Sequence, residues 1–304
     1  MNRSKVSIIF FLFLTGCLSL HAQTTTLQVV TKQIEKTFPY KKDYEVNIEG
    51  EKAEVVIESW AKNEIKVEMD LIAKHPTKKQ AEKDLVYIKH QAELEKNKIY
   101  LRNYISVPEG SPKPESSLSA RYTITVPENC PVYLKNQMGE ATVNNLSNRF
   151  RFNGKFTKID LFNVQGMVDL NSRFGDIFGR QIGGNVNIYS RRSDINLAEL
   201  NGSFNIEAYY GVMEVFASKD ITDLNITANH TDVFLYNANP QSFGYALTAN
   251  NGKINLPNNL NVDLLESTTD QKKIQFKPDQ EYYPNITISI SFGNLQVEKE
   301  KKKP

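Results

Sequence analysis

The sequence predicts an all-β protein, a two-sheet parallel β-solenoid with about 18 residues per coil, preceded by a strand-rich N-terminal region with one short helix. Two observations predict this class. A small residue recurs at every ninth position from Gly139 to Gly211, and apolar side chains follow it two and four positions later. Such a period is typical of repeat architectures, because one short unit cannot bury its apolar side chains alone and stacks on its neighbours.

The small positions of this pattern are Gly139, Asn148, Thr157, Gly166, Gly175, Gly184, Ser193, Gly202 and Gly211. The pairs that follow them are Ala141/Val143, Phe150/Phe152, Ile159/Leu161, Val168/Leu170, Ile177/Gly179, Val186/Ile188, Ile195/Leu197, Phe204/Ile206 and Met213/Val215. After short insertions the pattern resumes at Leu224/Ile226, Val233/Leu235, Tyr245/Leu247 and Ile254/Leu256. Two units make one coil, so alternate pairs are expected to stack into two parallel sheets around a thin core.

Residues spaced 18 apart are expected to stack at the corners of the coil. One apolar side chain per coil occupies a fixed bend, and these residues are Leu146, Val164, Ile182 and Leu200. Gly166, Gly184 and Gly202 stack at another turn, where glycine adopts a positive φ without steric cost.

Charged side chains form further ladders at the turns. The basic ladder consists of Lys155, Arg173 and Arg191. Asp176 and Asp194 form an acidic ladder with Lys158 beneath them. Because the two series lie three positions apart, we expect them to neutralise each other across the turn as surface charges rather than to form a catalytic pair.

The flanking regions are expected to extend the strand content. After a signal peptide over 1–22, residues 23–130 form a strand-rich region continuous with the solenoid repeats. Within it, Thr77 and Gln80 have capping-box spacing at the start of a helix that runs to about Leu85. The other expected elements are a hairpin with strands near 86–94 and 99–105, an exposed loop over 108–114, solenoid repeats over 131–262, and a C-terminal covering strand and basic tail over 263–304.

The N-terminus has the pattern of a secretory signal, with Arg3 and Lys5 before a short apolar region. Cleavage is expected after Ala22, and the alternative is a lipobox that leaves Cys17 attached to lipid. Both predict an exported protein in the periplasm, the outer membrane or at the cell surface. After cleavage at Ala22 only Cys130 remains, which leaves no intramolecular disulfide. A lone buried thiol is favoured over a nucleophile, because no histidine lies nearby in the sequence.

Composition and motifs argue against several function classes. The chain carries 37 basic and 35 acidic residues, and this balance does not indicate nucleic-acid binding. His75, His90 and His230 lack metal-ligand spacing, and no nucleophile elbow, phosphate loop or dinucleotide motif is present. The turns hold too few oxygen ligands for calcium. We therefore expect no cofactor and no enzymatic activity, with a glycan-active β-helix enzyme as the least favoured alternative.

The two outer faces of the predicted solenoid differ in character. One carries ordinary polar residues, and Asn187, Asn205 and Asn225 are expected to point outward there as a ladder. The other carries exposed or edge aromatics, which are Phe162, Phe178, Phe216, Phe234 and Tyr236. A row of exposed aromatic rings is a candidate platform for sugar rings or a protein partner. The favoured interpretation, however, is that the N-terminal domain, the final strand or a second copy covers this face.

The chain resembles the bacterial putative-adhesin family of secreted β-solenoid proteins, a domain of unknown function. The resemblance rests on the segment 55–67, on the strand that ends at Pro127, on the small-x-apolar-x-apolar coils, and on the turns at Gly175-Asp176 and Gly184-Asn185. It implies an envelope or surface location and no catalysis. The expected function is an adhesin-like module that binds a glycan or envelope protein, the alternative being a scaffold that self-associates. Membrane contact is expected only through the lipid anchor.

Overall fold

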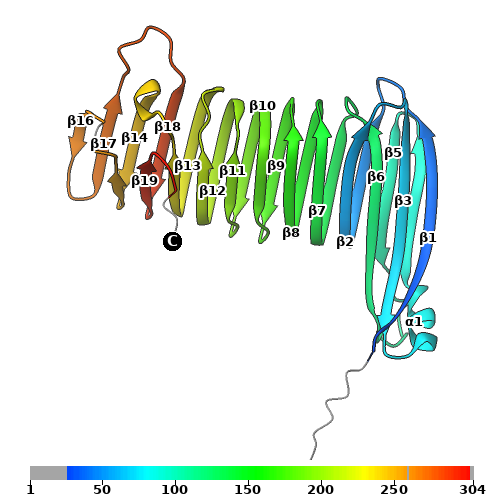
Figure 1. Cartoon of the computed structure of the whole chain (residues 1–304). Coiled ribbons are helices and arrows are strands. Elements are labelled where there is room, and N and C mark those ends of the chain that lie inside the picture. Colours follow the sequence, from blue (N-terminus) through cyan, green and yellow to red (C-terminus); the bar gives the residue numbers. More distant parts are fainter. Residues whose placement is uncertain (1–25, 259, 302–304) are drawn as a thin grey trace, which may run out of the picture.

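The computed structural model describes residues 26–258 and 260–301. Within these residues, 19 strands join in one continuous sheet, accompanied by one α-helix and one short 3-10 helix. Figure 1 shows the strands side by side along one elongated body, with the N-terminal strands at one end and the C-terminal strands at the other. The all-β class, the long and mostly parallel sheet and the single short α-helix are therefore confirmed.

The central strands pair in parallel and in a regular register. Val168 pairs with Val186, and Val186 pairs in turn with Phe204, so that equivalent positions of the repeat lie side by side. Insertions between β12 and β13 increase the number of residues that separate equivalent positions, so that Phe204 pairs with Leu224. These strands are β7 (Val132–Leu146), β8 (Arg149–Val164), β9 (Met167–Arg173), β10 (Ile177–Arg191), β11 (Ile195–Ala198), β12 (Asn201–Phe216) and β13 (Ile221–Tyr236).

The sheet has two arms whose apolar side chains face one another. The first arm buries residues such as Val186, Ile188 and Phe204, and the second buries residues such as Ile195 and Leu197. Outward positions alternate with these buried ones, as a strand with one solvated face requires. We use "rung" for one turn of the chain through both arms.

The corners of each rung depend on particular backbone conformations. Gly166, Gly184 and Gly202 have φ of 101°, 90° and 96°, as predicted. A Cβ on Gly184 would lie 2.1 Å from the carbonyl oxygen of Gly166, so the glycines allow rungs to stack closely. The apolar bend residues Leu146, Val164, Ile182 and Leu200 are all buried, which confirms the predicted inward corner.

The N-terminal region begins the solenoid rather than only preceding it. Strand β2 (Glu45–Trp60) pairs in parallel with β7 along its length, with Val46 opposite Val132 and Val55 opposite Ala141. Beyond β2, the remaining strands close this end of the sheet with mainly antiparallel pairs. They are β1 (Gln28–Pro39), β3 (Glu64–His75), the predicted hairpin β4 (Ile88–Glu95) and β5 (Lys98–Ile105), and β6 (Ser117–Pro127).

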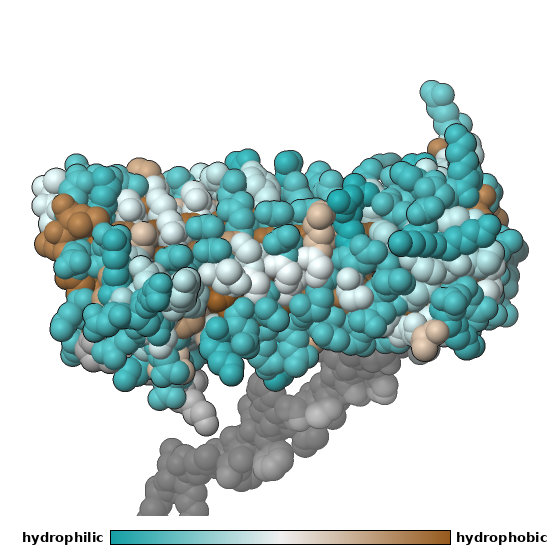
Figure 2. Space-filling view, turned by 90° about the horizontal axis from the view of Figure 1, so that it is seen from above, coloured by the Kyte–Doolittle hydropathy of each residue, from teal (hydrophilic) through white to brown (hydrophobic). Residues whose placement is uncertain are grey.

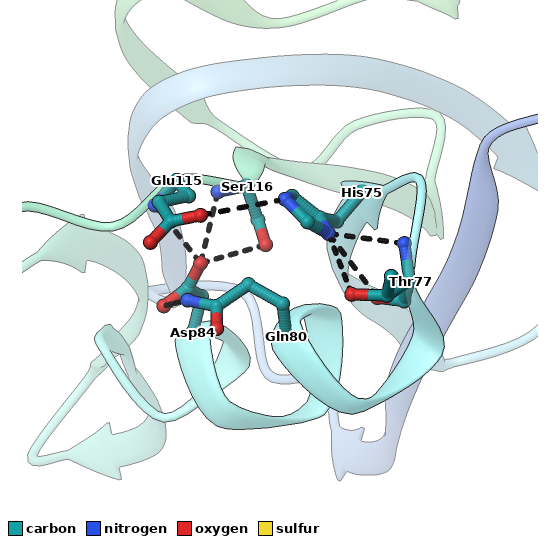
Figure 3. A network of polar contacts seen from close by, with 6 residues as sticks. All are labelled: His75, Thr77, Gln80, Asp84, Glu115 and Ser116. Atoms are coloured by element: carbon teal, nitrogen blue, oxygen red, sulfur yellow. Dashed lines mark hydrogen bonds and ion pairs between the residues drawn. The ribbon is translucent and has the colours of Figure 1, made fainter. Parts of the chain in front are cut away.

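Helix α1 (Lys78–Leu85) begins and ends where the sequence predicts. The prediction of a capping box is wrong. Thr77 is the N-cap residue without a side-chain capping bond, because its hydroxyl lies 3.0 Å from His75 Nδ1. Gln80 Nε2 donates to Asp84 Oδ1 at 3.0 Å instead of reaching back to the cap. Figure 3 shows the resulting network, in which the buried Asp84 carboxylate also accepts from Ser116.

The C-terminal strands lie inside the solenoid. Strands β18 (Asn285–Ser291) and β19 (Asn294–Glu298) pair on one side with β13 and on the other with β14 (Gly244–Asn250) and β15 (Lys253–Asn255). Figure 1 shows β18 between β13 and β14. The sequence predicts a covering strand here, whereas this segment is a rung with neighbours on both sides.

A hairpin and an exposed apolar surface complete the C-terminal end. The turn of 3-10 helix at Pro240–Ser242 precedes β14, and β16 (Asp263–Ser267) with β17 (Gln271–Phe276) extends the sheet in antiparallel pairing beyond β14. Leu264 and Leu265 on β16 are 58% and 62% exposed. In Figure 2, hydrophobic residues gather at the end of the molecule that carries these strands, while hydrophilic residues cover most of the visible face.

The expected neutralisation of the turn ladders is wrong. Lys158 pairs with Asp160 at 3.0 Å, on its own strand. Asp176 and Asp194 accept backbone N–H groups of the next rung, from Asp194 at 2.9 Å and from Val212 at 2.8 Å. Among the described residues, the basic ladder of Lys155, Arg173 and Arg191 forms no ion pair. The turn carboxylates therefore stabilise the stacking of rungs rather than the neighbouring cations.

Candidate binding site

The five aromatic residues predicted from the sequence all lie on the outer side of the second arm. One row along the solenoid consists of Phe178, Asn196, Glu214 and Phe234, paired in that order. The neighbouring row carries Phe162 and Arg180 at one end and Phe216 and Tyr236 at the other. The aromatics therefore form two separate groups on this face, with polar side chains between them.

The two groups differ in how far their ring faces are covered. Phe162 and Phe178 are tilted by 51° with centroids 5.7 Å apart, so their faces do not overlap fully. Phe216 and Tyr236 are stacked at 4.8 Å and 25°, and Tyr236 is buried. Beside them, Lys301 Nζ lies 2.6 Å from Glu214 Oε1, which holds the end of the described chain against this part of the face.

A hollow of about 400 Å³ opens beside Phe178 on the second arm. We call it the Phe178 hollow. Its polar rim can donate and accept hydrogen bonds around the ring, and Asn196 Nδ2 already donates to Glu214 Oε2 at 2.8 Å. The side chains that line it are Lys158, Asp176, Ile177, Phe178, Asp194, Ile195, Asn196, Val212 and Glu214.

A second hollow, of about 380 Å³, lies on the first arm, on the face that the sequence predicts to be ordinary polar surface. We call it the asparagine hollow. The Arg151 guanidinium lies 5.0 Å from the centroid of Tyr133, and Asn187 Nδ2 donates to Asp169 Oδ1 at 3.0 Å. Its polar lining includes Tyr133, Arg151, Asn153, Asp169, Asn171, Asn187, Tyr189, Asn205 and Glu207.

This second hollow was detectable in part from sequence. Asn187, Asn205 and Asn225 are exposed, as the predicted outward ladder requires. The missed signal is the pair of outward tyrosines, Tyr133 and Tyr189, which stand among these polar residues at the same face. Tyrosine at an outward position that is polar in most rungs can indicate a binding surface, just as a row of aromatic side chains can.

The described thiol and histidine side chains differ in their surroundings. Cys130 is buried, as predicted, and burial raises the pKa of its thiol to about 12. Burial, with a smaller effect of Lys32, lowers the pKa of His90. Within residues 26–258 and 260–301, no three His, Cys, Asp or Glu side chains are grouped to hold a metal ion.

Some sequence predictions fall on residues that the structure does not describe. The signal segment and Cys17 lie outside residues 26–258 and 260–301. Within those residues, no helix is long and apolar enough to cross a membrane.

Comparison with known proteins places the chain in a family. The family model described as Toastrack DUF4097 matches residues 44–298, so the chain belongs to this family of unknown function. The match spans the rungs from β2 to β19, which carry both hollows. No curated protein matches the chain.

Three solved structures are similar to the chain at low sequence identity. A putative cell adhesion protein from Clostridium sporogenes is 12% identical, with 88% of this chain and 100% of that chain covered and a TM-score of 0.26. A putative adhesin from Bacteroides fragilis is 14% identical, with 88% and 97% covered and a TM-score of 0.33. A putative lipid binding protein from Parabacteroides distasonis is 12% identical, with 88% and 96% covered and a TM-score of 0.34.

Proposed function

We propose that the protein is a non-enzymatic, exported binding module of the cell envelope that recognises a glycan through the Phe178 hollow. The observation that carries this proposal is the row Phe178, Asn196, Glu214 and Phe234 along the second arm. It places an aromatic ring at each end and an amide and a carboxylate between them. This is a combination suited to a ligand that has both apolar faces and hydroxyl groups.

The spacing of this row favours an extended saccharide over a single sugar. Neighbouring strands in a sheet lie about 4.8 Å apart, so the rings of Phe178 and Phe234 stand about 14 Å apart along the solenoid. The ring of Phe178 is half-buried and only tilted against Phe162, which leaves part of its face for a sugar ring. Asn196 and Glu214 offer a donor and an acceptor to the hydroxyl groups in between.

Binding of purified protein to a panel of polysaccharide fragments tests this proposal. Phe178→Ala and Phe234→Ala are expected to weaken the strongest interaction at least tenfold. The matched control is Tyr104→Ala, which removes an exposed ring on β5, far along the chain from the row. A loss caused by Tyr133→Ala with no effect of Phe178→Ala would overturn the assignment and move the site to the asparagine hollow.

A scaffold that assembles end to end is the second candidate. The exposed Leu264 and Leu265 on the terminal strand β16 favour it, because an unpaired strand edge with apolar side chains can add a second chain. Sizing chromatography over a range of concentrations is expected to show assembly that Leu265→Glu abolishes. A strict monomer at all concentrations contradicts the scaffold.

Export is the remaining part of the proposal, and the mature N-terminus tests it. Cell fractionation followed by N-terminal sequencing is expected to find the protein in the envelope, beginning at Gln23. A lipid-modified Cys17 at the N-terminus would instead establish an anchor. A cytoplasmic protein that retains Met1 would overturn export.

A further inference from the structure

One corner of the solenoid carries a continuous ladder of large side chains. In stacking order, each rung from β7 to the one formed by β18 and β19 contributes one residue at the corner between the first and second arms. We call this set the corner ladder. All seven members have positive φ, between 50° and 63°. They are Met138, Phe156, Phe174, Arg192, Tyr210, His230 and Phe292.

The rings of the corner ladder stack face to face along the solenoid axis. The centroids of Phe156 and Phe174 are 4.8 Å apart, those of Tyr210 and His230 4.9 Å, and those of His230 and Phe292 5.0 Å. The Arg192 guanidinium lies 5.4 Å from the Phe174 centroid and extends this stack by one rung. These contacts therefore cover both ring faces of Phe174 and His230 and one ring face of each other aromatic member.

The corner ladder is an exposed apolar ridge. Its apolar members range from 39% exposed at Phe174 to 55% exposed at Phe292. At a strand spacing of about 4.8 Å, seven rungs span about 29 Å in a straight line. Because stacking within the ladder already covers most of these ring faces, the ridge is less suited than the Phe178 hollow to stacking on a sugar. An extended apolar ridge of this size on a protein surface indicates an interaction site.

The charge on one side of the ridge is positive. The residue before each ladder member is Gln137, Lys155, Arg173, Arg191, Tyr209, Asn229 or Ser291. These positions and the ladder itself hold four cations, Lys155, Arg173, Arg191 and Arg192, and no carboxylate. None of the four forms an ion pair with another described residue. The turn on the other side of the ladder carries four carboxylates, Glu140, Asp176, Asp194 and Asp232. The last three accept backbone N–H groups of the next rung.

We propose that the corner ladder binds the surface of an anionic lipid bilayer. The ring edges and Met138 would enter the interfacial region, where aromatic side chains are favoured. The four cations would lie among the headgroup phosphates, whose charge complements theirs. Because all contacts come from one corner of the stacked rungs, they can engage a flat surface together.

Cosedimentation with vesicles tests this proposal. Protein carrying Cys17→Ser, so that no lipid anchor contributes, is mixed with vesicles of equimolar phosphatidylglycerol and phosphatidylcholine or of phosphatidylcholine alone. The Cys17→Ser protein with an unchanged corner ladder is expected to bind the vesicles that contain phosphatidylglycerol at least tenfold more strongly than vesicles of phosphatidylcholine alone. The variant Arg173→Glu/Arg191→Glu/Arg192→Glu is expected to lose this binding. Equal binding to both vesicle types, or none, overturns the proposal.

Matched variants separate the ridge from general electrostatic attraction. Lys42→Glu/Lys79→Glu/Lys113→Glu changes the net charge equally at exposed positions outside the ladder, and is expected to retain binding. Phe156→Ser/Phe174→Ser keeps all cations and is expected to weaken binding at least fivefold. Thermal melts of each variant confirm folding. Equal losses in the two charge variants, or unchanged binding by the serine variant, contradict a specific role of the ridge.

Discussion

Phe156 and Phe174 occupy the same corner of successive rungs, and their rings stack with centroids 4.8 Å apart and planes 16° apart. Both residues have a positive φ, 54° and 60°, which a side chain with a Cβ adopts at a cost. Both are also substantially exposed. The chain therefore holds large rings at strained, solvent-facing corners, where glycine would fit the backbone better.

The stability of the corner should depend little on the ring itself. We expect Phe174→Gly to change the free energy of unfolding by less than about 1 kcal/mol, because relief of strain offsets the lost stacking. Phe174→Val should cost more than about 1 kcal/mol, because a β-branched side chain fits positive φ poorly. Urea denaturation measures both. A larger loss for Phe174→Gly than for Phe174→Val would mean that the ladder serves folding instead of binding.

The close stacking of rungs should make Gly184 intolerant of any side chain. A Cβ there would lie 2.1 Å from the Gly166 carbonyl oxygen at a φ of 90°. We expect Gly184→Ala to destabilise the protein by more than about 3 kcal/mol. Gly110→Ala is the control, because Gly110 also has a positive φ, 77°, but a Cβ there meets nothing within 4 Å. Similar thermal melts for the two variants would refute the stacking argument.

The inward and outward positions of the first arm should differ sharply in tolerance. Ile188 is buried in the core, so Ile188→Asp should abolish cooperative folding by burying an unpaired charge. Asn187, its neighbour in sequence, is exposed and makes one hydrogen bond to Asp169. Asn187→Ala should therefore change stability by less than about 0.5 kcal/mol. Thermal melts that rank the two variants in the opposite order would reverse the assignment of faces.

Asp84 should make the N-terminal region sensitive to acid. Burial alone would raise its pKa, but hydrogen bonds from Ser116, Gln80 and Glu115 outweigh burial and hold the pKa below the ordinary value of 3.8. The ionised carboxylate thus contributes stability above the ordinary pKa, and this stability is lost as the pH falls through the lowered pKa.

The substitution Asp84→Asn tests this dependence. We expect it to lower the free energy of unfolding at neutral pH by about 2 kcal/mol, as hydrogen bonds to a charged group are lost. The variant should also lose less stability than the wild type when the pH falls below 3.8. Urea denaturation across this range measures both effects. Parallel curves for the two proteins would show that Asp84 does not titrate as described.

Much of the fold could be predicted because every rung repeats the same local rule. The inward pairs, the corner glycines and the buried bend residues all follow from spacing in the sequence. The sequence also indicates that β2 is a rung, because Val46 and Val55 are separated by the same number of positions as the units of the repeat. The place of β18 could not be predicted, because a repeat pattern does not say in which order rungs stack once the regular spacing ends.

The candidate sites were less predictable, because their properties depend on neighbouring rungs. Alternation places Phe178 and Tyr236 on the same outer face, but only the structure shows that Tyr236 is buried and Phe178 borders a hollow. The regular spacing of Phe156 and Phe174 was present in the sequence. Their exposure follows from the positive φ at the corner, which propensity alone assigns to glycine.

The affinity of the Phe178→Ala variant for the strongest-binding oligosaccharide tests the central proposal most directly. Isothermal titration calorimetry of the folded variant and the wild type should show a dissociation constant at least tenfold higher for the variant. An affinity within twofold of the wild type would contradict recognition of a glycan at the Phe178 hollow.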